Sequence, residues 1–438
     1  MTIQIKVYDL KFERFLMGSE VKKKKNFLVM FLRKKAIKRL EKVAIGRIFF
    51  EDPLGSFVFG SSKQSKPEVK IRVNDLRFYT LFAVRGALGA SEAFVKNFWQ
   101  TDNLIKTVQI FALNQEVLMS LEKGFLNFFS KPAMTFIKIL SRNTLDQSRV
   151  NISAHYDIGN DLFKLFLDQK LMYSSAYFSH EKMNIEEAQE EKLRRICQKL
   201  NLSKSDHVLE IGSGWGGLCV YIAKNYGCRV TTTTISKEQF DYTLKLIKKE
   251  GLSSQITLLQ KDYRELEGVF DRVVSVEMIE AVGADYLDDF MAVCSKRLKA
   301  TGTAVIQAIT INDQRYDQAL KEVDFIKRYI FPGSFIPSVH AILNSSKKAT
   351  DLGLYHLEDI GPHYSLTLKR WRDRFLEKKE EILKLGFDSS FIRLWDYYFC
   401  YCIGGFEERS ISNVQLVFSK PFYRGDLSKN CVWQGGEV

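Results

Sequence analysis

A regular alternation of short apolar strands with helices between residues 207 and 310 constrains the fold most. Five segments have the length and apolar or β-branched composition of buried strands: HVLEI (207–211), CRVTTTTI (228–235), ITLLQ (256–260), DRVVSVE (271–277) and TAVIQAIT (303–310). Because strands separated by helices pair in parallel, we expect an α/β chain with a Rossmann-like, doubly wound sheet covered on both faces. NVQLVFSK (413–420) is expected to form a late edge strand that can run antiparallel.

The loop EIGSGWGG (210–217) joins the first of these strands to the first helix. Gly212, Gly214 and Gly216 allow a tight turn and bring backbone N–H groups against a ligand at a helix N-terminus. Such a loop also occurs in dinucleotide-binding folds, so it does not identify the ligand alone.

Three details favour S-adenosylmethionine over NAD. The loop reads GSGWGG rather than GxGxxG, and Glu210 precedes the glycines, where a carboxylate suits a methionine amine. Asp262 follows the third strand, where an adenine amino group needs an acceptor. The second strand ends in Thr234 rather than in a ribose-binding carboxylate, so Thr234 and Gln239 are the polar substitutes. The sequence therefore predicts a methyltransferase.

The first fifty residues carry most of the net charge. They hold 14 Lys and Arg against 4 Asp and Glu, which gives +10 of the total of +13. Within residues 22–49, apolar side chains alternate with lysines, and Ile37, Leu40 and Val43 are spaced as one face of a helix. Such a helix can lie in an anionic membrane surface, pack its apolar stripe into the domain, or simply solubilise the chain. Aromatic residues near lysines also occur in nucleic-acid binders. No RNA- or DNA-binding motif accompanies them, so we expect a membrane and no nucleic acid.

The length of 438 residues suggests two domains. We expect a small, basic, mixed α/β domain over 1–135 that attaches to the membrane, a linker over 136–150, and the methyltransferase domain over 151–425. No apolar run is long enough to span a bilayer and no secretory signal is visible, so we expect a cytoplasmic protein, peripheral on the inner face of the membrane. The seven cysteines lack a zinc spacing, so we expect reduced thiols and no metal.

Several ordered motifs resemble the cyclopropane-fatty-acyl-phospholipid synthase family. The resemblance covers about 150–421, and more loosely the segment 78–99. Its motifs are HYDIGNDLFKLFLDQKLMYSSAYF (155–178), EIGSGWGGL, TTISKEQ (233–239), KDYREL (261–266), EMIEAVG (277–283), RYIFPGSFIPS (328–338), DIGPHYSLTLKRW (359–371) and VQLVFSKP (414–421).

This resemblance implies a class I methyltransferase sheet and an activity on phospholipid acyl chains. The family transfers a methyl group from S-adenosylmethionine to a cis double bond, and a base then removes a proton so that a cyclopropane closes. It also implies a bicarbonate ion as that base or its relay. By matching, Glu280 and Tyr364 hold the ion through side chains and Ile309 through its main chain. Tyr173 and Ser174 contact the methionine end of the cofactor, and Tyr263 packs near the adenine or is a buried structural residue.

Two of the matched positions depart from the family pattern. Gln307 stands where the family has His, and Ser175 where it has Cys. Gln donates a hydrogen bond but cannot carry a proton, whereas Ser preserves the backbone N–H through which the Cys acts. These departures leave methyl transfer in place and open a second outcome, in which the acyl chain acquires a methyl or methylene branch instead of a ring. A nucleic-acid methyltransferase is a more distant alternative, and the oligomeric state stays open between a monomer and a homodimer.

Overall fold

The computed structural model describes residues 22–61, 67–114, 117 and 158–425. The chain divides into two compact units. The first comprises Met1–Leu140, Asp324–Ile326 and Lys379–Glu408, and the second comprises Ser141–Val323, Lys327–Lys378 and Arg409–Val438. The expected linker over 136–150 lies outside the described residues.

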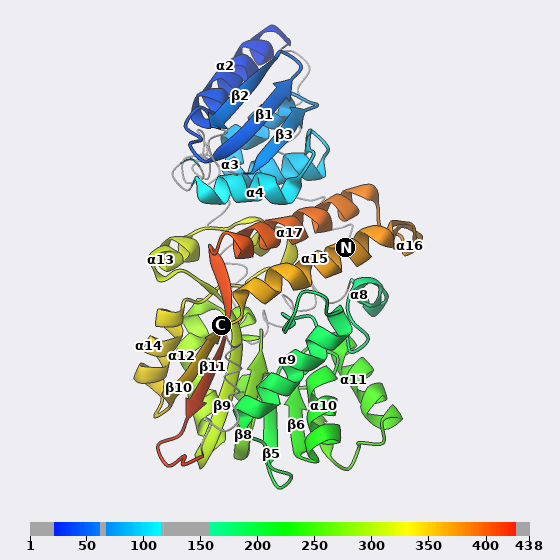
Figure 1. The fold of residues 1–438 in the computed structure, drawn as a ribbon, viewed down its shortest axis with the longest axis vertical. Helices are drawn as coiled ribbons and strands as arrows, with labels where there is room; N and C mark the ends of the chain where they lie inside the picture. The colour runs from blue at the N-terminus through cyan, green and yellow to red at the C-terminus, as the bar shows by residue number, and fades with distance from the viewer. Residues whose placement is uncertain (1–21, 62–66, 115–116, 118–157, 426–438) are drawn as a thin grey trace. The chain divides into compact units, whose positions relative to one another are not determined.

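The first unit is a mixed α/β fold, as the sequence predicts. Its sheet has the order β2-β1-β3-β4, in which β1 pairs antiparallel with β2 and parallel with β3. Figure 1 shows this sheet with its helices. The bounds are α2 (Lys22–Leu40), β1 (Gly46–Asp52), β2 (Gly55–Ser61), β3 (Glu68–Val73), α3 (Arg77–Val95), β4 (Trp99–Thr101) and α4 (Leu104–Leu113).

Residues 379–408 differ from the expected domain division. They form α16 (Lys379–Lys384) and α17 (Ser389–Glu407), which belong to the first unit although the sequence analysis assigned them to the methyltransferase domain. The Arg393 guanidinium donates to the carbonyl oxygen of Phe94 at 2.8 Å, and the ring of Tyr397 lies 5.5 Å from that of Phe94. Aromatic packing and a long-range hydrogen bond therefore draw this late segment back to the N-terminal fold.

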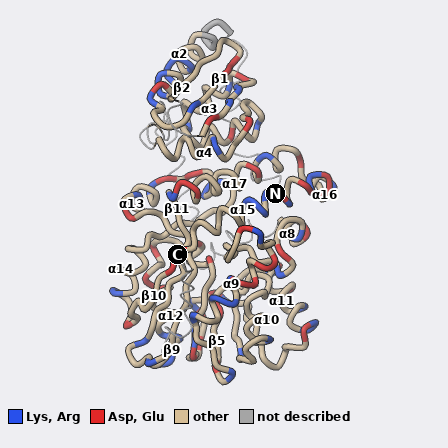
Figure 2. Tube along the Cα trace, in the orientation of Figure 1, with Lys and Arg blue, Asp and Glu red and all other residues tan. Residues whose placement is uncertain are grey.

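The apolar stripe of helix α2 was expected either to lie in a membrane surface or to pack into the domain. Ile37, Leu40 and the following Val43 are 8%, 7% and 4% exposed, so this stripe packs into the domain. The preceding turns differ, because Phe27 is 78% and Phe31 49% exposed. Figure 2 shows the basic residues along the same helix. Among the described helices, none combines the length and apolarity needed to cross a bilayer.

The second unit contains a seven-stranded sheet in the order β10-β11-β9-β8-β5-β6-β7. Strands β5 to β9 pair in parallel, and β11 pairs antiparallel with both β9 and β10. The Rossmann-like prediction is therefore confirmed. The strands are β5 (His207–Ile211), β6 (Arg229–Thr233), β7 (Ile256–Leu259), β8 (Phe270–Val276), β9 (Leu298–Ile311), β10 (Gly353–Asp359) and β11 (Ile411–Ser419).

Strand β11 runs antiparallel, as expected, but it is not at the edge. The edge position is taken by β10, whose residues are exposed or half-buried throughout. Its sequence GLYHLED has no clear apolar alternation, so periodicity alone gave no sign of a strand. The interior position of β11 fits its almost continuous burial.

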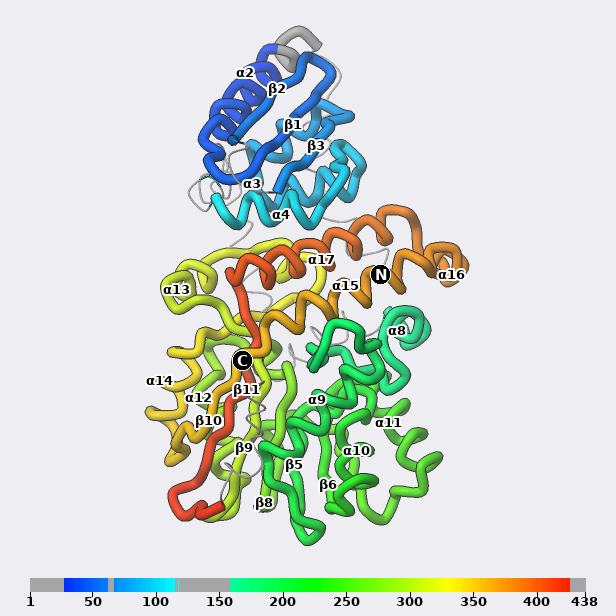
Figure 3. Tube along the Cα trace, in the orientation of Figure 1, coloured from blue at the N-terminus to red at the C-terminus, as the bar shows by residue number. Residues whose placement is uncertain are grey.

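The side chains of consecutive residues on the central strands pack into two separate hydrophobic cores. Val208 and Val305 face α9, α10 and α11, whereas Leu209 and Ile306 face α12 and α14 (Figures 1 and 3). This follows from the two-residue period of a strand. The helices are α8 (Asn160–Phe166), α9 (Ile185–Leu200), α10 (Gly217–Tyr226), α11 (Lys237–Lys249), α12 (Leu287–Lys296), α13 (Asp313–Lys321), α14 (Val339–Ala349) and α15 (Gly361–Glu377).

Candidate active site

The glycine-rich loop lies where β5 meets α10. Gly212, Gly214 and Gly216 have φ angles of 97°, 49° and 89°, which favour glycine. The N–H groups of Gly212 and Ser213 donate to the carbonyl oxygen of Thr233 at 3.1 and 2.8 Å, which ties the loop to the end of β6. The loop is therefore fixed against the sheet and leads directly into the N-terminus of α10, as the sequence predicts.

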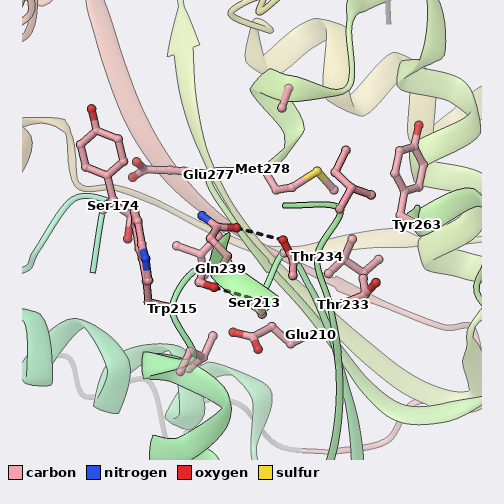
Figure 4. Close-up of a pocket in the computed structure, with 18 of the residues that line it drawn as sticks. Ser174, Glu210, Ser213, Trp215, Thr233, Thr234, Gln239, Tyr263, Glu277 and Met278 are labelled. Atoms are coloured by element: carbon pink, nitrogen blue, oxygen red, sulfur yellow. Dashed lines mark hydrogen bonds between the residues drawn. The ribbon is translucent and has the colours of Figure 1, made fainter. Parts of the chain in front are cut away.

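A cavity lies at the carboxyl ends of β5, β6 and β8 (Figure 4). Its empty space measures about 1090 Å³ when the solvent-filled open mouth is included. Ligands of doubly wound sheets bind at this end of the strands. All nine residues expected to bind the cofactor line it: Tyr173, Ser174, Glu210, Gly212, Gly214, Thr234, Gln239, Asp262 and Tyr263.

The buried carboxyl group of Glu210 lines the cavity, and the buried ammonium group of Lys192 contacts Ser174 of the lining. Burial raises the pKa of Glu210 to about 8, although its carboxylate accepts a hydrogen bond from Thr232 at 2.5 Å. Burial lowers the pKa of Lys192 to about 8, against the attraction of nearby carboxylates, and its ammonium donates to the Ser174 hydroxyl at 2.8 Å. A cationic ligand beside Glu210 would favour the ionised form of that carboxyl, so this wall suits a positively charged group.

The residues expected near the ribose and adenine are held by local contacts. Thr234 donates to the side-chain oxygen of Gln239 at 2.9 Å (Figure 4). The Asp262 carboxylate accepts from the Arg264 guanidinium at 2.7 Å and caps the short helical turn that follows it. The buried hydroxyl of Tyr263 has no hydrogen-bond partner among the described residues. Asp262 retains limited capacity for a further donor, because a carboxylate accepts about four hydrogen bonds.

Three of the five residues expected to be catalytic converge on one carboxylate, that of Glu277. The Ser175 backbone N–H and the Gln307 amide donate to its Oε1 at 3.0 and 2.8 Å. The Tyr364 hydroxyl donates to its Oε2 at 2.7 Å, and the Asn413 amide donates to Oε1 at 2.6 Å. Glu277 also lines the cofactor cavity, where Figure 4 shows its carboxylate directed toward the side occupied by Ser174.

Glu280 and Ile309 form a second pair beside this cluster. The Ile309 N–H donates to Oε1 of Glu280 at 2.5 Å, while Oε2 is buried and has no partner among the described residues. Burial, reinforced by the negative charge of Glu277, raises the pKa of Glu280 to about 8. The two carboxyl groups are therefore unlike: Glu277 is held by donors suited to an anion, whereas Glu280 favours its neutral form.

The backbone of Glu277 is strained. Its φ is 49°, a left-handed conformation that is uncommon outside glycine and typically costs roughly 1–3 kcal/mol. Its N–H donates to the carbonyl oxygen of Gln307 at 2.8 Å, so the strained residue is anchored to β9. Strain of this kind persists where the surrounding structure over-determines it, which is typical of functional sites.

Four residues of the site were not predicted from the sequence: Glu277, Asn413, Gln415 and Lys192. Glu277 directly follows a buried strand, at the edge of the sheet where functional side chains gather, and this position was the available signal. Asn413 and Gln415 lie opposite Ile309 and Gln307 on the neighbouring antiparallel strand. Their proximity depends on strand pairing, so the linear sequence gave no sign of it.

The strand order, the glycine loop and the acidic cavity together define a class I methyltransferase that uses S-adenosylmethionine. Comparison with known proteins is more specific. The model of the mycolic acid cyclopropane synthetase family matches residues 143–416. The chain belongs to this family.

Relatives and solved structures agree with that assignment. Tuberculostearic acid methyltransferase of Mycobacterium tuberculosis is 33% identical over 73% of this chain and 76% of its own length. Cyclopropane-fatty-acyl-phospholipid synthase of Escherichia coli is 35% identical over 81% of this chain and 89% of its own. The cyclopropane synthase MmaA2 from Mycobacterium tuberculosis matches with a TM-score of 0.58 and 28% identity, covering 62% of this chain and 98% of that one.

The residues present fit the two expected small molecules differently. S-adenosylmethionine fits, because the cavity is lined by a carboxyl group suited to its amine and by the glycine loop. Bicarbonate does not fit in the same way. The donors expected to hold it through Ser175, Gln307 and Tyr364 already point to the Glu277 carboxylate.

Proposed function

We propose that this protein transfers the methyl carbon of S-adenosylmethionine to the cis double bond of an unsaturated phospholipid acyl chain and closes a cyclopropane ring. The observation that carries the proposal is that the cofactor cavity adjoins a carboxylate held by four donors, Glu277 belonging to both. An alkene is a weak nucleophile, so the site must present a strong electrophile and exclude water. A base must then stand beside the transferred methyl group.

The chain's own residues would divide the work. Glu210 holds the amine of S-adenosylmethionine, Thr234 and Gln239 hold its ribose, and Asp262 and Tyr263 lie against its adenine. S-adenosylmethionine supplies a methyl group as an electrophile. Tyr173 and Ser174 lie at the methionine end.

Two aromatic rings, those of Tyr173 and Trp215, line the cavity, and further buried rings pack against them. The ring of Tyr173 lies 5.3 Å from those of both Phe163 and Trp371, and Phe163 lies 4.9 Å from Trp215. Aromatic faces stabilise cations and repel no apolar chain. They therefore suit both a sulfonium group and the carbocation that forms on the acyl chain when the methyl group is transferred.

A second product is favoured by one residue. Gln307 stands where the family pattern has His. A relative that is 33% identical to this chain is named for tuberculostearic acid. If the proton leaves a neighbouring chain carbon instead of the new methyl group, the product is a methyl-branched chain that retains a double bond. Both products gain one CH₂, so mass alone does not separate them.

We expect the purified protein to add one CH₂ to acyl chains when it is mixed with S-adenosylmethionine and liposomes of cis-monounsaturated phospholipid. The acyl groups are released as methyl esters, and the molecular masses of the esters are measured before and after mild catalytic hydrogenation. A heavier ester that takes up no hydrogen is a cyclopropane, whereas one that takes up hydrogen is the branched alternative. No gain in mass, with cofactor binding intact, would contradict both.

Membrane attachment through helix α2 is part of the same proposal. Phe27, Leu28, Met30 and Phe31 are between 44% and 78% exposed on a helix that carries nine Lys and Arg and no Asp or Glu. Exposed aromatic residues among lysines are typical of segments that insert into an anionic membrane surface. The expected location is therefore peripheral, on the inner face of the membrane, and a homodimer stays a prediction.

Replacing Phe27 and Phe31 by Ser should lower binding to anionic vesicles by about tenfold or more, since each ring contributes roughly 1.5–3 kcal/mol when fully buried. Vesicle sedimentation measures this. Val58→Ser is the matched control, because Val58 is 55% exposed on β2 of the same unit and lies outside α2. Equal binding by all three proteins, or salt-sensitive binding to RNA in place of vesicles, would contradict the membrane role and favour the nucleic-acid alternative.

A further inference from the structure

The carboxylate of Glu277 accepts more hydrogen bonds than a loop residue needs to hold its position. Among the described residues, Oε1 receives three hydrogen bonds, from the Ser175 N–H and from the amides of Gln307 and Asn413. Oε2 receives one, from the Tyr364 hydroxyl. These donors come from the segment after α8, from β9, from β11 and from α15, so distant parts of the second unit meet at one carboxylate. A site with this many donors is built for an anion.

A hydrogen-bonded chain fixes the direction of the Gln307 amide. The Lys199 ammonium donates to the side-chain oxygen of Gln415, whose NH₂ group donates to the oxygen of Gln307 at 2.9 Å. The NH₂ group of Gln307 is thereby left to donate to Glu277. Because an ammonium group only donates, it sets the polarity of both amides. The chain therefore presents Gln307 to Glu277 as a donor and never as an acceptor.

Glu280 is a second carboxyl group beside the Glu277 cluster, and it is less suited to act as a base. Its Oε1 is taken by the Ile309 N–H and its Oε2 is buried. Its pKa is raised to about 8 by burial and by the charge of Glu277. Because Glu280 favours its neutral form, the neighbouring carboxylate of Glu277, which accepts four hydrogen bonds, is the better candidate for the base.

We infer that Glu277 is the base of the reaction, its carboxylate standing in this chain where the family resemblance assigns a bicarbonate ion. This inference rests on the proposed function. After methyl transfer, a C–H bond of the cationic acyl chain breaks and its proton passes to Oε2 of Glu277. The electron pair of that bond forms the third ring bond when the proton comes from the new methyl group, or a chain double bond when the proton comes from a neighbouring chain carbon. Oε2 is the receiving atom because Oε1 already accepts three hydrogen bonds.

Glu277→Gly is the test. Glycine suits the φ of 49° and vacates the space of the carboxylate, so an added anion can enter it. In buffer freed of carbon dioxide, the wild-type protein should keep full activity on unsaturated liposomes, while the glycine variant should lose activity by about 100-fold or more, the usual contribution of a base. Bicarbonate or acetate should then restore the glycine variant by about tenfold or more.

Two further variants make the result interpretable. Glu277→Gln fills the same space without a charge, so it should be as inactive as the glycine variant and should not respond to bicarbonate. Glu267→Gln changes an exposed glutamate of the same unit and should keep wild-type activity. Binding of S-adenosylhomocysteine, measured by calorimetry, should be within a few-fold of wild type in every variant, which separates a lost base from a misfolded site.

The outcomes separate this inference from the proposed function. Wild-type activity that disappears without carbon dioxide and returns with bicarbonate would overturn the role of Glu277 and leave the proposed function standing. An active glycine variant in carbon dioxide-free buffer, or a bicarbonate response of Glu277→Gln, would also overturn it. A wild-type protein that modifies no lipid in either buffer would overturn the proposed function and the role of Glu277 with it.

Discussion

Replacing Gly212 by Val is expected to weaken binding of S-adenosylmethionine by about 100-fold, or about 2.7 kcal/mol, with only a modest loss of stability. A Cβ at this position would lie 3.1 and 3.2 Å from the Cγ and Cβ atoms of Met278, and both residues line the cofactor cavity. The branched side chain must displace Met278 or occupy the cavity itself. Titration calorimetry with S-adenosylhomocysteine and thermal unfolding measure the two effects.

Gly251→Val is the matched control for the backbone. Gly251 has a φ of 69°, and a Cβ there would meet nothing within 4 Å. It carries the same left-handed strain, roughly 1–2 kcal/mol for a residue with a Cβ, but it does not line the cavity. Both variants should therefore lose stability through backbone strain, and only Gly212→Val, whose side chain also meets Met278, should lose the cofactor. Normal binding by Gly212→Val would remove the glycine loop from the cofactor site.

The affinity for S-adenosylmethionine is expected to rise about 20-fold between about pH 6 and about pH 7.5. Burial raises the pKa of Glu210 to about 8, so most of this carboxyl group is protonated below that pH when the cavity holds no cation. Pairing with the ligand amine requires the ionised form, whose fraction grows almost tenfold per pH unit below the pKa. Binding should therefore release a proton, which calorimetry in buffers of different ionisation enthalpy detects.

Glu210→Gln isolates this effect. The amide keeps the size of the side chain but cannot ionise, so the variant should bind weakly at every pH and release no proton from this position. Lys192 also has a pKa near 8 and lies close enough to interact with Glu210, so it is the other group that could produce a pH dependence. An unchanged pH dependence in Glu210→Gln would show that Glu210 does not carry it and would direct attention to Lys192.

Much of the fold could be predicted from the sequence, because local patterns determine it. Short apolar and β-branched strands, the helices between them and a glycine loop predicted the parallel core of the sheet, and β5 to β9 confirm it. Two predictions failed where local pattern was weak. Strand β10 lacks apolar alternation, so β11 was placed at the edge. The aromatic helix α17 was assigned to the second domain, although its partners lie 300 residues earlier, as Arg393 and Phe94 illustrate.

The candidate site likewise has one part that the sequence predicted and one part that it did not. The nine residues predicted to bind the cofactor come from motifs within one segment each, and all nine line a single cavity. The family resemblance pointed to Ser175, Gln307 and Tyr364 but assigned their donors to a separate ion. Only the tertiary structure brought these donors onto Glu277.

The sequence by itself therefore determined the class of fold, the cofactor loop and the residue types available for catalysis, because each depends on neighbours in the chain. The tertiary structure decided which carboxylate those residues serve. Asn413 and Gln415 reach Glu277 and Gln307 only because β11 inserts antiparallel between β9 and β10. The direction of the Gln307 amide depends on Lys199, more than a hundred residues away, through Gln415. Hydrogen-bond polarity of this kind is a property of packed strands and helices, so no local pattern encodes it.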